Sequence, residues 1–165
     1  MNRYGQMMDE QTFQSLYEKT SRSLWAYLAR VSGRGDVADD ILQETFFRFL
    51  VRNPPAMDSL SVRTYLFRIA TNLLHDRWRR NQNAKSLETV EHGFTHDAEA
   101  HLDIHRVMRQ LRPRERELLW LAYVEGLNHA EIASITGLSA ISIRLLLFRA
   151  RRKAAALLRP EMVKI

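Results

Sequence analysis

The sequence predicts an all-α protein built from two small helical domains. Apolar residues recur at intervals of three and four along most of the 165 residues, which is the spacing of a buried helix face. Only 6 glycines and 4 prolines interrupt the chain, and no segment shows the two-residue alternation of a strand. A polar, aperiodic stretch at 81–98 separates two helical halves. We therefore expect domains at 1–80 and 99–165, joined by a flexible linker.

Three helices are expected in the first half. The first covers about residues 9–32, the second lies in VADDILQETFFRFLVR, and the third is SVRTYLFRIATNLLHDRWRR at 61–80. The residues expected to end or cap them are Gly33 and Gly35, Asp36, Asn53-Pro54-Pro55, and Ser59 or Ser61. Residues that suit helix ends thus stand where the apolar pattern stops.

The third of these helices carries apolar residues on two faces. The first face holds Val62, Tyr65, Leu66, Ile69 and Leu73, and the second holds Phe67, Thr71, Leu74 and Trp78. The second face has two interpretations. Phe67 and Trp78 can stack on unpaired bases, or they can pack with Leu74 against the first helix.

The second half predicts a helix-turn-helix unit. Helices are expected at about 98–111, 113–125, 130–135 and 140–158. Pro113 suits the first turn of its helix, and Asn128 and Ser139 are natural N-caps. A short helix, a turn at Gly137 and a second, basic helix form a unit that can place one helix in a DNA major groove.

Charge and composition narrow the class of protein. The net charge is −1 over residues 1–61, +4 over 62–80, −2 over 81–98 and +5 over 99–165, so positive charge gathers on two helical modules. This distribution favours nucleic-acid contact at two places, although a solvated basic surface is an equal alternative from charge alone. The chain has no cysteine, which excludes disulfides and thiolate metal sites. It lacks a signal-peptide core at its start and any apolar run of about 20 residues, so a cytoplasmic protein that does not insert into membranes is expected.

Three segments resemble one known family. DVADDILQETFFRFL at 36–50, SVRTYLFRIATNLLHDRWRR at 61–80 and LRPRERELLWLAYVEGLNHAEIASITGLSAISIRLLLFRARRK at 111–153 resemble, in this order, motifs of extracytoplasmic-function (ECF, group IV) sigma factors, which belong to the sigma-70 family. The resemblance implies a region 2-like domain at 1–80, a linker, and a region 4-like domain at 99–165. It also implies core RNA polymerase, promoter DNA and an anti-sigma factor as partners, and no cofactor.

The resemblance also implies functional residues in the first domain. Asp40, Gln43 and Glu44 match the surface that binds the polymerase, whereas Asp36 and Asp39 are expected to cap their helix. The residues expected to contact and melt the −10 region are Arg63, Arg68, Asn72, Arg79 and Arg80. The loop at 53–60 occupies the position of the family's base-capturing loop, but its sequence NPPAMDSL differs from better-known members.

In the last helix the resemblance implies contacts to the −35 region, with one departure from the family pattern. The expected residues are Ser142, Arg144, Leu145, Leu146, Arg149, Arg151 and Arg152. Leu145 and Leu146 stand where relatives carry polar and basic side chains. They could contact thymine methyl groups, pack against an inhibitor or neighbouring subunit, or be buried by a rotation of the helix.

Other interpretations of the chain are weaker. Asp97, His101 and His105, with His92 and His96 nearby, have a spacing that can bind zinc, but they straddle the linker and we expect no metal site. No phosphate loop or catalytic motif is present, so an enzyme is not expected. Two alternatives stay open. One is a stand-alone helix-turn-helix transcription regulator, against which the acidic helix at 36–50 argues. The other is a protein that sequesters polymerase or an anti-sigma factor with weak specific DNA binding.

Overall fold

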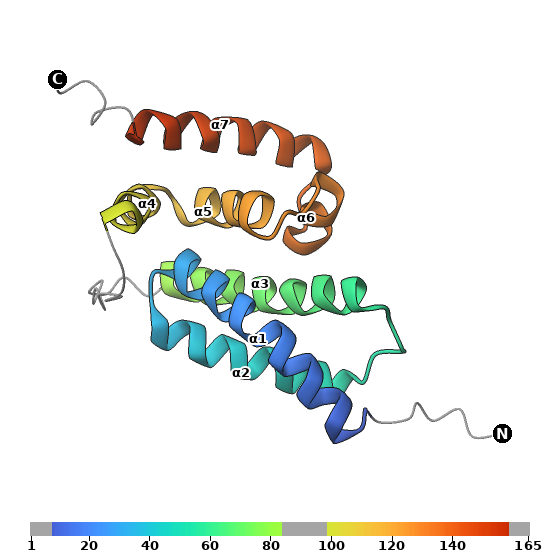
Figure 1. The fold of residues 1–165 in the computed structure, drawn as a ribbon. Coiled ribbons are helices and arrows are strands. Elements are labelled where there is room, and N and C mark those ends of the chain that lie inside the picture. Colours follow the sequence, from blue (N-terminus) through green and yellow to red (C-terminus); the bar gives the residue numbers. More distant parts are fainter. Residues whose placement is uncertain (1–7, 84–98, 159–165) are drawn as a thin grey trace. The chain divides into compact units, whose positions relative to one another are not determined.

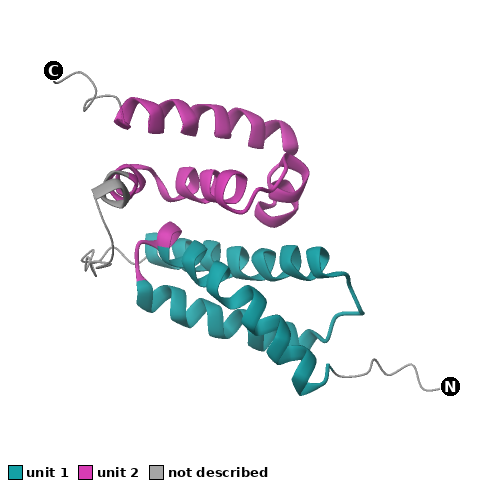
Figure 2. Cartoon of the chain, in the orientation of Figure 1, with its two compact units in different colours: residues 1–29, 35–88 teal, residues 30–34, 89–165 magenta. Residues whose placement is uncertain are grey.

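Every element that the structure describes is a helix. The computed structural model describes residues 8–83 and 99–158 (Figure 1), and within these ranges no strand occurs. The chain divides into two compact units, residues 1–29 with 35–88 and residues 30–34 with 89–165 (Figure 2). The predicted all-α fold with two small domains is confirmed. Most of the predicted linker, residues 84–98, lies outside the described residues.

The part of the first unit that the structure describes has three helices held together by aromatic side chains. They are α1 (Glu10–Ser32), α2 (Gly35–Arg52) and α3 (Ser59–Asn83). Each pair of helices shares a contact between two aromatic rings. The ring centroids lie 4.9 Å apart for Tyr17–Phe46 between α1 and α2, 6.0 Å apart for Phe49–Tyr65 between α2 and α3, and 5.3 Å apart for Tyr27–Phe67 between α1 and α3. Such pairs stabilise a core beyond the area that they bury.

Aspartates cap two of these three helices. The Thr12 amide donates to Asp9 Oδ1 over 2.7 Å at the start of α1, and the Ser61 amide donates to Asp58 Oδ1 over 2.7 Å at the start of α3. The bond from the Ser61 amide lowers the pKa of Asp58, because it stabilises the carboxylate. The prediction that Ser59 or Ser61 caps α3 was therefore wrong, since Ser59 is already helical and the carboxylate before it reaches the free amide.

The described residues of the second unit form four α-helices and one wider turn. They are α4 (Glu99–Gln110), α5 (Pro113–Leu119), α6 (His129–Thr136) and α7 (Ala140–Leu158). The segment predicted as one regular helix over 113–125 instead ends in a π-helical turn, η1 (Trp120–Val124), in which the Glu125 amide donates to the Trp120 carbonyl over 3.1 Å. Within residues 99–158 the buried apolar side chains are those of Val107, Leu111, Leu118, Leu121, Ile132, Ile135, Ile143, Leu147 and Ala150, and the polar side chains of Glu117 and Thr136 are buried as well.

The predicted turn between α6 and α7 has the geometry of a helix-turn-helix unit. Asn128 caps α6, because its Oδ1 accepts from the Glu131 amide over 2.9 Å while Glu131 Oε2 accepts from the Asn128 amide over 2.8 Å. Gly137 ends α6 with φ 77°, a left-handed conformation that glycine adopts without steric cost. Ser139 Oγ then accepts from the Ser142 amide over 3.2 Å at the start of α7. The caps predicted at Asn128 and Ser139 are confirmed.

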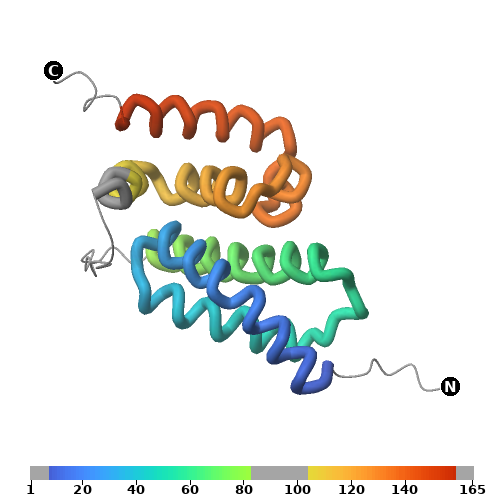
Figure 3. Tube along the Cα trace, viewed as in Figure 1, coloured from blue at the N-terminus to red at the C-terminus, as the bar shows by residue number. Residues whose placement is uncertain are grey.

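α6 and α7 are bent by 101° relative to each other, which is the crossing typical of this motif, and the Cα trace passes from one to the other through a tight turn (Figure 3). No single helix among the described residues is long and apolar enough to cross a membrane. Among these residues, only the bent pair of α6 and α7, counted as one segment, has the length and composition of a membrane span.

Candidate nucleic-acid and partner interfaces

One exposed face of α2 combines acidic and apolar side chains. Asp40, Glu44, Phe47 and Val51 recur at i, i+4, i+7 and i+11, so they lie along one side of the helix, with Gln43 beside them. The exposed fractions of Phe47 and Val51 are 60% and 67%, which is unusual for apolar residues of this size. Neither residue was predicted as a site residue from the sequence. Their register with Asp40 and Glu44, on the side of α2 opposite to buried Thr45 and Phe49, is the signal that could have identified them.

The acidic residues of this α2 face have surface-exposed arginine partners. Arg48 Nε lies 2.7 Å from Glu44 Oε1 one turn along α2, and Arg77 Nη1 of α3 lies 3.7 Å from Asp40 Oδ2. The side chain of Asp40 is 70% exposed, so its ion pair contributes little to stability. Both carboxylates remain accessible to a partner.

Asp36 and Asp39 do not cap α2 as predicted. Asp36 lies in the first helical turn, because α2 already begins at Gly35. Asp39 Oδ1 accepts a hydrogen bond of 2.7 Å from the indole Nε1 of Trp25, so it connects α2 to α1. The carboxylate of Asp39 therefore joins two helices of the first unit.

The outward face of α3 gathers three of the five residues predicted for the −10 region. Arg68, Asn72 and Arg79 are exposed and lie on one side of the helix at i, i+4 and i+11. Arg79 also pairs with Asp76. Arg63 lies on the opposite side, half-buried, with its guanidinium carbon 5.7 Å from the centroid of the Phe67 ring. Arg80 is exposed on a neighbouring side.

Most of the second face of α3 packs into the core, which decides between the two interpretations for Phe67 and Leu74. Phe67 is 2% exposed and Leu74 is fully buried. The rings of Phe67 and Tyr27 lie 5.3 Å apart, so Phe67 packs on α1 and is not available for base stacking. Trp78 is half-buried and stacks on His75 at 5.2 Å.

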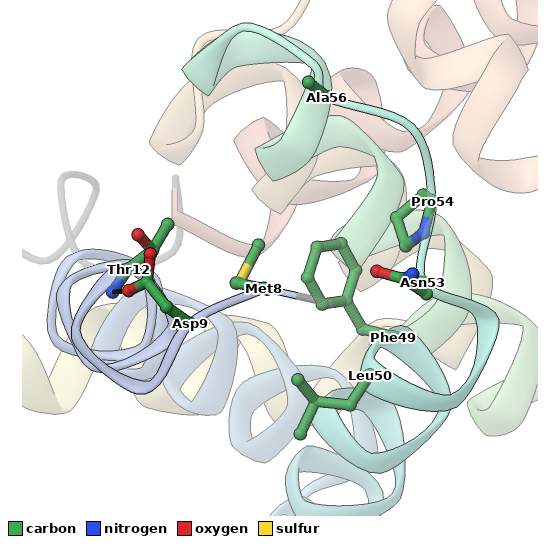
Figure 4. A pocket seen from close by; sticks show the side chains of 8 residues that line it. All are labelled: Met8, Asp9, Thr12, Phe49, Leu50, Asn53, Pro54 and Ala56. Carbon is green, nitrogen blue, oxygen red and sulfur yellow. Dashed lines mark hydrogen bonds between the residues drawn. The ribbon is translucent and has the colours of Figure 1, made fainter. Parts of the chain in front are cut away.

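The loop between α2 and α3 borders a hollow of about 320 Å³. Figure 4 shows the ring of Phe49, the amide of Asn53 and the side chain of Met8 around this hollow, which Asp9, Thr12, Leu50, Pro54 and Ala56 complete. Asn53 adopts a positive φ of 40° directly after α2, where the chain turns into the loop. Leu50 is 39% exposed because it lies at this rim. The hollow offers an amide with both donor and acceptor atoms, whereas the ring of Phe49 beneath it is only 2% exposed.

The outward face of α7 carries apolar residues between arginines. Leu145 is 49% exposed, whereas Leu147 and Ala150 are buried. The helix has therefore not rotated to bury Leu145, which rules out that interpretation for this residue; Leu146 is half-buried on a flank. The arginines at 144, 149, 151 and 152 are all exposed. Ile141 and Phe148, which were not predicted as site residues, share the face of Leu145 and are 84% and 49% exposed.

The described part of the second unit also contains Ser142, predicted to contact DNA, and the side chain of one candidate zinc ligand. Ser142 is half-buried, and its Oγ accepts from Ser139 Oγ over 2.9 Å within the cap of α7. Of the candidate zinc ligands, only the side chain of His105 belongs to the described part; those of His92, His96, Asp97 and His101 lie outside it. Among the described residues no group of three His, Asp or Glu side chains is arranged to hold a metal ion.

Two family models match the chain in succession. The model described as Sigma-70 region 2 matches residues 16–84, and the model described as Sigma-70, region 4 matches residues 101–153. The first match contains most of α1 and all of α2 and α3, and the second contains α6 and most of α7.

Relatives match along nearly the whole chain. The RNA polymerase sigma factor NccH of Alcaligenes xylosoxydans xylosoxydans is 31% identical, with 94% of this chain and 91% of that protein covered. The ECF RNA polymerase sigma factor EcfG of Rhodopseudomonas palustris is 30% identical, covering 82% and 79%. The ECF RNA polymerase sigma factor SigM of Bacillus subtilis is 26% identical, covering 88% and 94%.

Two solved structures share the fold. The sigma factor RpoE, crystallised with the anti-sigma factor NepR from Bartonella quintana, superposes with a TM-score of 0.74 at 21% identity, covering 93% of this chain and 98% of that one. CnrH in complex with the cytosolic domain of CnrY gives a TM-score of 0.66 at 24% identity, covering 91% and 89%. With the two family matches and the relatives of 30% and 31% identity, this chain belongs to the ECF RNA polymerase sigma factors of the sigma-70 family and is an alternative sigma factor that directs transcription.

Proposed function

We propose that this sigma factor binds core RNA polymerase through α2 and promoter DNA through α3, the α2–α3 loop and α7. Residues up to about 80 then serve polymerase binding and −10 melting, and residues from about 99 serve −35 recognition. One observation carries the proposal: each of the two family-matched regions presents an exposed helix face whose charge and apolar content suit a different partner.

The polymerase-binding face consists of Asp40, Gln43, Glu44, Phe47 and Val51. This surface has a charged end, formed by the two exposed carboxylates. Its apolar end is formed by the two exposed apolar residues, which lie one and two turns further along α2. Apolar side chains at the centre of an interface supply most of its binding free energy, and charges at its rim set the orientation and rate of association. This combination supports a stable protein contact better than the acidic residues alone.

The −10 contact is assigned to the outward face of α3 and to the loop hollow. Arg68 and Arg79 can pair with phosphates, and the amide of Asn72 between them can donate to and accept from a base edge. The hollow beside the loop at 53–60 has room for a group larger than water, and the amide of Asn53 at its border can donate to and accept from a base. The loop position in the family supports base capture there.

The −35 contact is assigned to α7, the second helix of the helix-turn-helix unit. It carries arginines at 144, 149, 151 and 152 and no acidic residue, so it complements a polyanion along its length. Arg151 Nη1 donates to Tyr123 Oη over 3.0 Å, which holds that guanidinium in one orientation.

An anti-sigma factor is the proposed regulator. The structurally similar RpoE and CnrH chains were each solved with a second protein, NepR and the cytosolic domain of CnrY. The exposed apolar residues on α2 give this chain a surface that a regulator can cover in competition with the polymerase.

Reconstitution with bacterial core polymerase tests the proposal. The purified chain should bind core polymerase and produce discrete new start sites on fragmented genomic DNA. Asp40→Lys with Glu44→Lys, and separately Phe47→Ser, should each weaken binding to core polymerase at least tenfold without unfolding the chain. A matched control compares Glu44→Lys with Glu18→Lys, an exposed glutamate of α1 that accepts a hydrogen bond from Gln14.

Three results would count against these assignments. Equal binding of the Glu44→Lys and Glu18→Lys variants would remove α2 as the polymerase contact. Polymerase binding without transcripts would favour a sequestering protein. Specific DNA binding without any polymerase affinity would favour a stand-alone regulator.

A further inference from the structure

Ile141, Leu145 and Phe148 form an exposed apolar stripe on α7. They are 84%, 49% and 49% exposed and recur at i, i+4 and i+7, so they lie one above another. The core face of the same helix is complete without them, because Ile143, Leu147 and Ala150 are buried on the opposite side. The stripe is therefore available to a partner.

The surroundings of this stripe fit DNA. Arg149 and Arg152 are exposed along it and Arg144 flanks it, and α7 holds no acidic residue that would repel phosphates. The Arg152 guanidinium carbon lies 5.7 Å from the centroid of the Phe148 ring, a cation–π contact that orients its charge. A helix that offers several arginines around an apolar stripe complements a groove with anionic walls.

The position within the helix points to the bases themselves. Ile141 and Leu145 belong to the first two turns of α7, and in helix-turn-helix units the N-terminal residues of the second helix face the base edges. Neither side chain can form a hydrogen bond. If either faced an amino or carbonyl group, that group would lose water without gaining a partner. The thymine methyl is the apolar group on the major-groove edge of the bases.

We propose that Ile141 and Leu145 select thymine in the −35 element by contacting its 5-methyl group, while Phe148 holds Arg152 for a phosphate. This proposal rests on the proposed function, because it requires α7 to read the −35 region. It makes Ile141 and Leu145 specificity-determining residues at a helix face where hydrogen-bonding side chains would select other bases.

Replacing thymine by deoxyuridine tests the proposal, because it removes the methyl group and leaves every hydrogen-bonding group in place. The holoenzyme, reconstituted from the full chain and core polymerase, is first used to locate a promoter by transcription of genomic fragments. Each thymine of its −35 element is then replaced singly by deoxyuridine. Loss of one buried methyl contact should lower holoenzyme affinity about fourfold at one or two positions.

A pair of matched variants connects this effect to the stripe. Leu145→Ser should abolish the deoxyuridine effect at one position and Ile141→Ser at another, while core polymerase binding stays unchanged. Leu158→Ser is the control, because Leu158 is also 49% exposed but lies at the far end of α7. That variant should retain the full deoxyuridine effect.

The outcomes separate this inference from the proposed function. A −35 element without thymine, or −35-dependent transcription that is insensitive to deoxyuridine, would overturn the inference alone. Loss of anti-sigma binding in Leu145→Ser with no deoxyuridine effect would assign the stripe to a protein partner and overturn it too. Failure to bind polymerase or to start transcription at any site would overturn the proposed function and this inference with it.

Discussion

Tyr27 of α1 and Thr71 of α3 share a hydrogen bond of 2.8 Å between their hydroxyl groups, and both side chains are completely buried. This bond fixes the rotation of α3 relative to α1. Because Thr71 points inward, the next residue, Asn72, points outward together with Arg68. A contact within the core thus sets which residues of α3 face promoter DNA.

Removing the Thr71 hydroxyl should loosen the first unit. Thr71→Val keeps the shape of the side chain but removes a hydrogen-bond partner of the buried Tyr27 hydroxyl. We therefore expect the free energy of unfolding to fall by about 1–2 kcal/mol. Native-state hydrogen exchange of α1 and α3 amides measures the loss, because it reports this unit separately. Thr45→Val is the control, since the Thr45 hydroxyl donates to the Ile41 carbonyl within its own helix, α2. An equal effect of the two variants would show that the bond to Tyr27 is unimportant.

Asn72→Ala should impair promoter opening more than polymerase binding. Loss of one base-edge contact is worth about 1–3 kcal/mol, so we expect open complexes to fall about tenfold. Permanganate footprinting measures the unpaired thymines. Asn81→Ala is the matched variant, because Asn81 is exposed on α3 but on the opposite side from Asn72. A footprint that Asn72→Ala leaves unchanged would exclude Asn72 from melting.

The stability of the second unit should depend on pH through Glu115. Burial raises the pKa of Glu115, but hydrogen bonds from the Arg112 amide at 2.7 Å and from Lys153 Nζ at 3.0 Å outweigh burial and hold this pKa below its usual value. The unfolded chain then binds the proton more tightly. The stabilisation is complete above the unfolded pKa and is lost as pH falls through the folded pKa.

Glu115→Gln should remove this dependence. We expect it to lower the stability of the second unit by about 0.5–1 kcal/mol near neutral pH, and to flatten the pH profile on the acidic side. Hydrogen exchange of α5 and α7 amides at several pH values measures the loss of stability and its pH dependence. Lys153→Gln should reproduce part of the loss and keep a weaker pH dependence. A wild-type profile that rises toward acid would contradict the sign of the pKa change.

Binding of the holoenzyme to promoter DNA should weaken steeply with salt. Arginine contacts to phosphates release counterions, so the logarithm of the affinity should fall linearly with the logarithm of the salt concentration. Arg149→Gln should reduce this slope by about one, whereas Leu145→Ser should leave it unchanged. Fluorescence anisotropy across a salt series measures the slopes. A slope that does not respond to Arg149→Gln would place this side chain away from phosphates.

Local features of the chain were predictable because they depend on short segments. The helix-turn-helix unit follows from the cap at Asn128, the left-handed turn at Gly137 and the cap at Ser139, all within twelve residues. The start of α3 was misjudged because Asp58 and the two serines nearby all suit an N-cap. Only the backbone geometry decides which side chain reaches the free amide.

The sequence by itself determined the helical character of both units, the caps of the helix-turn-helix unit and the family, because each depends on residue type and spacing along the chain. Tertiary structure alone decided which faces are available. Phe67 and Phe148 are both aromatic residues on basic helices, yet the first packs against Tyr27 and the second is half-exposed under Arg152. Tertiary structure likewise decided that Phe47 and Val51 of α2 are exposed. Whether an apolar residue belongs to the core or to an interface depends on whether a neighbouring helix covers it, and the periodicity of one helix does not contain that information.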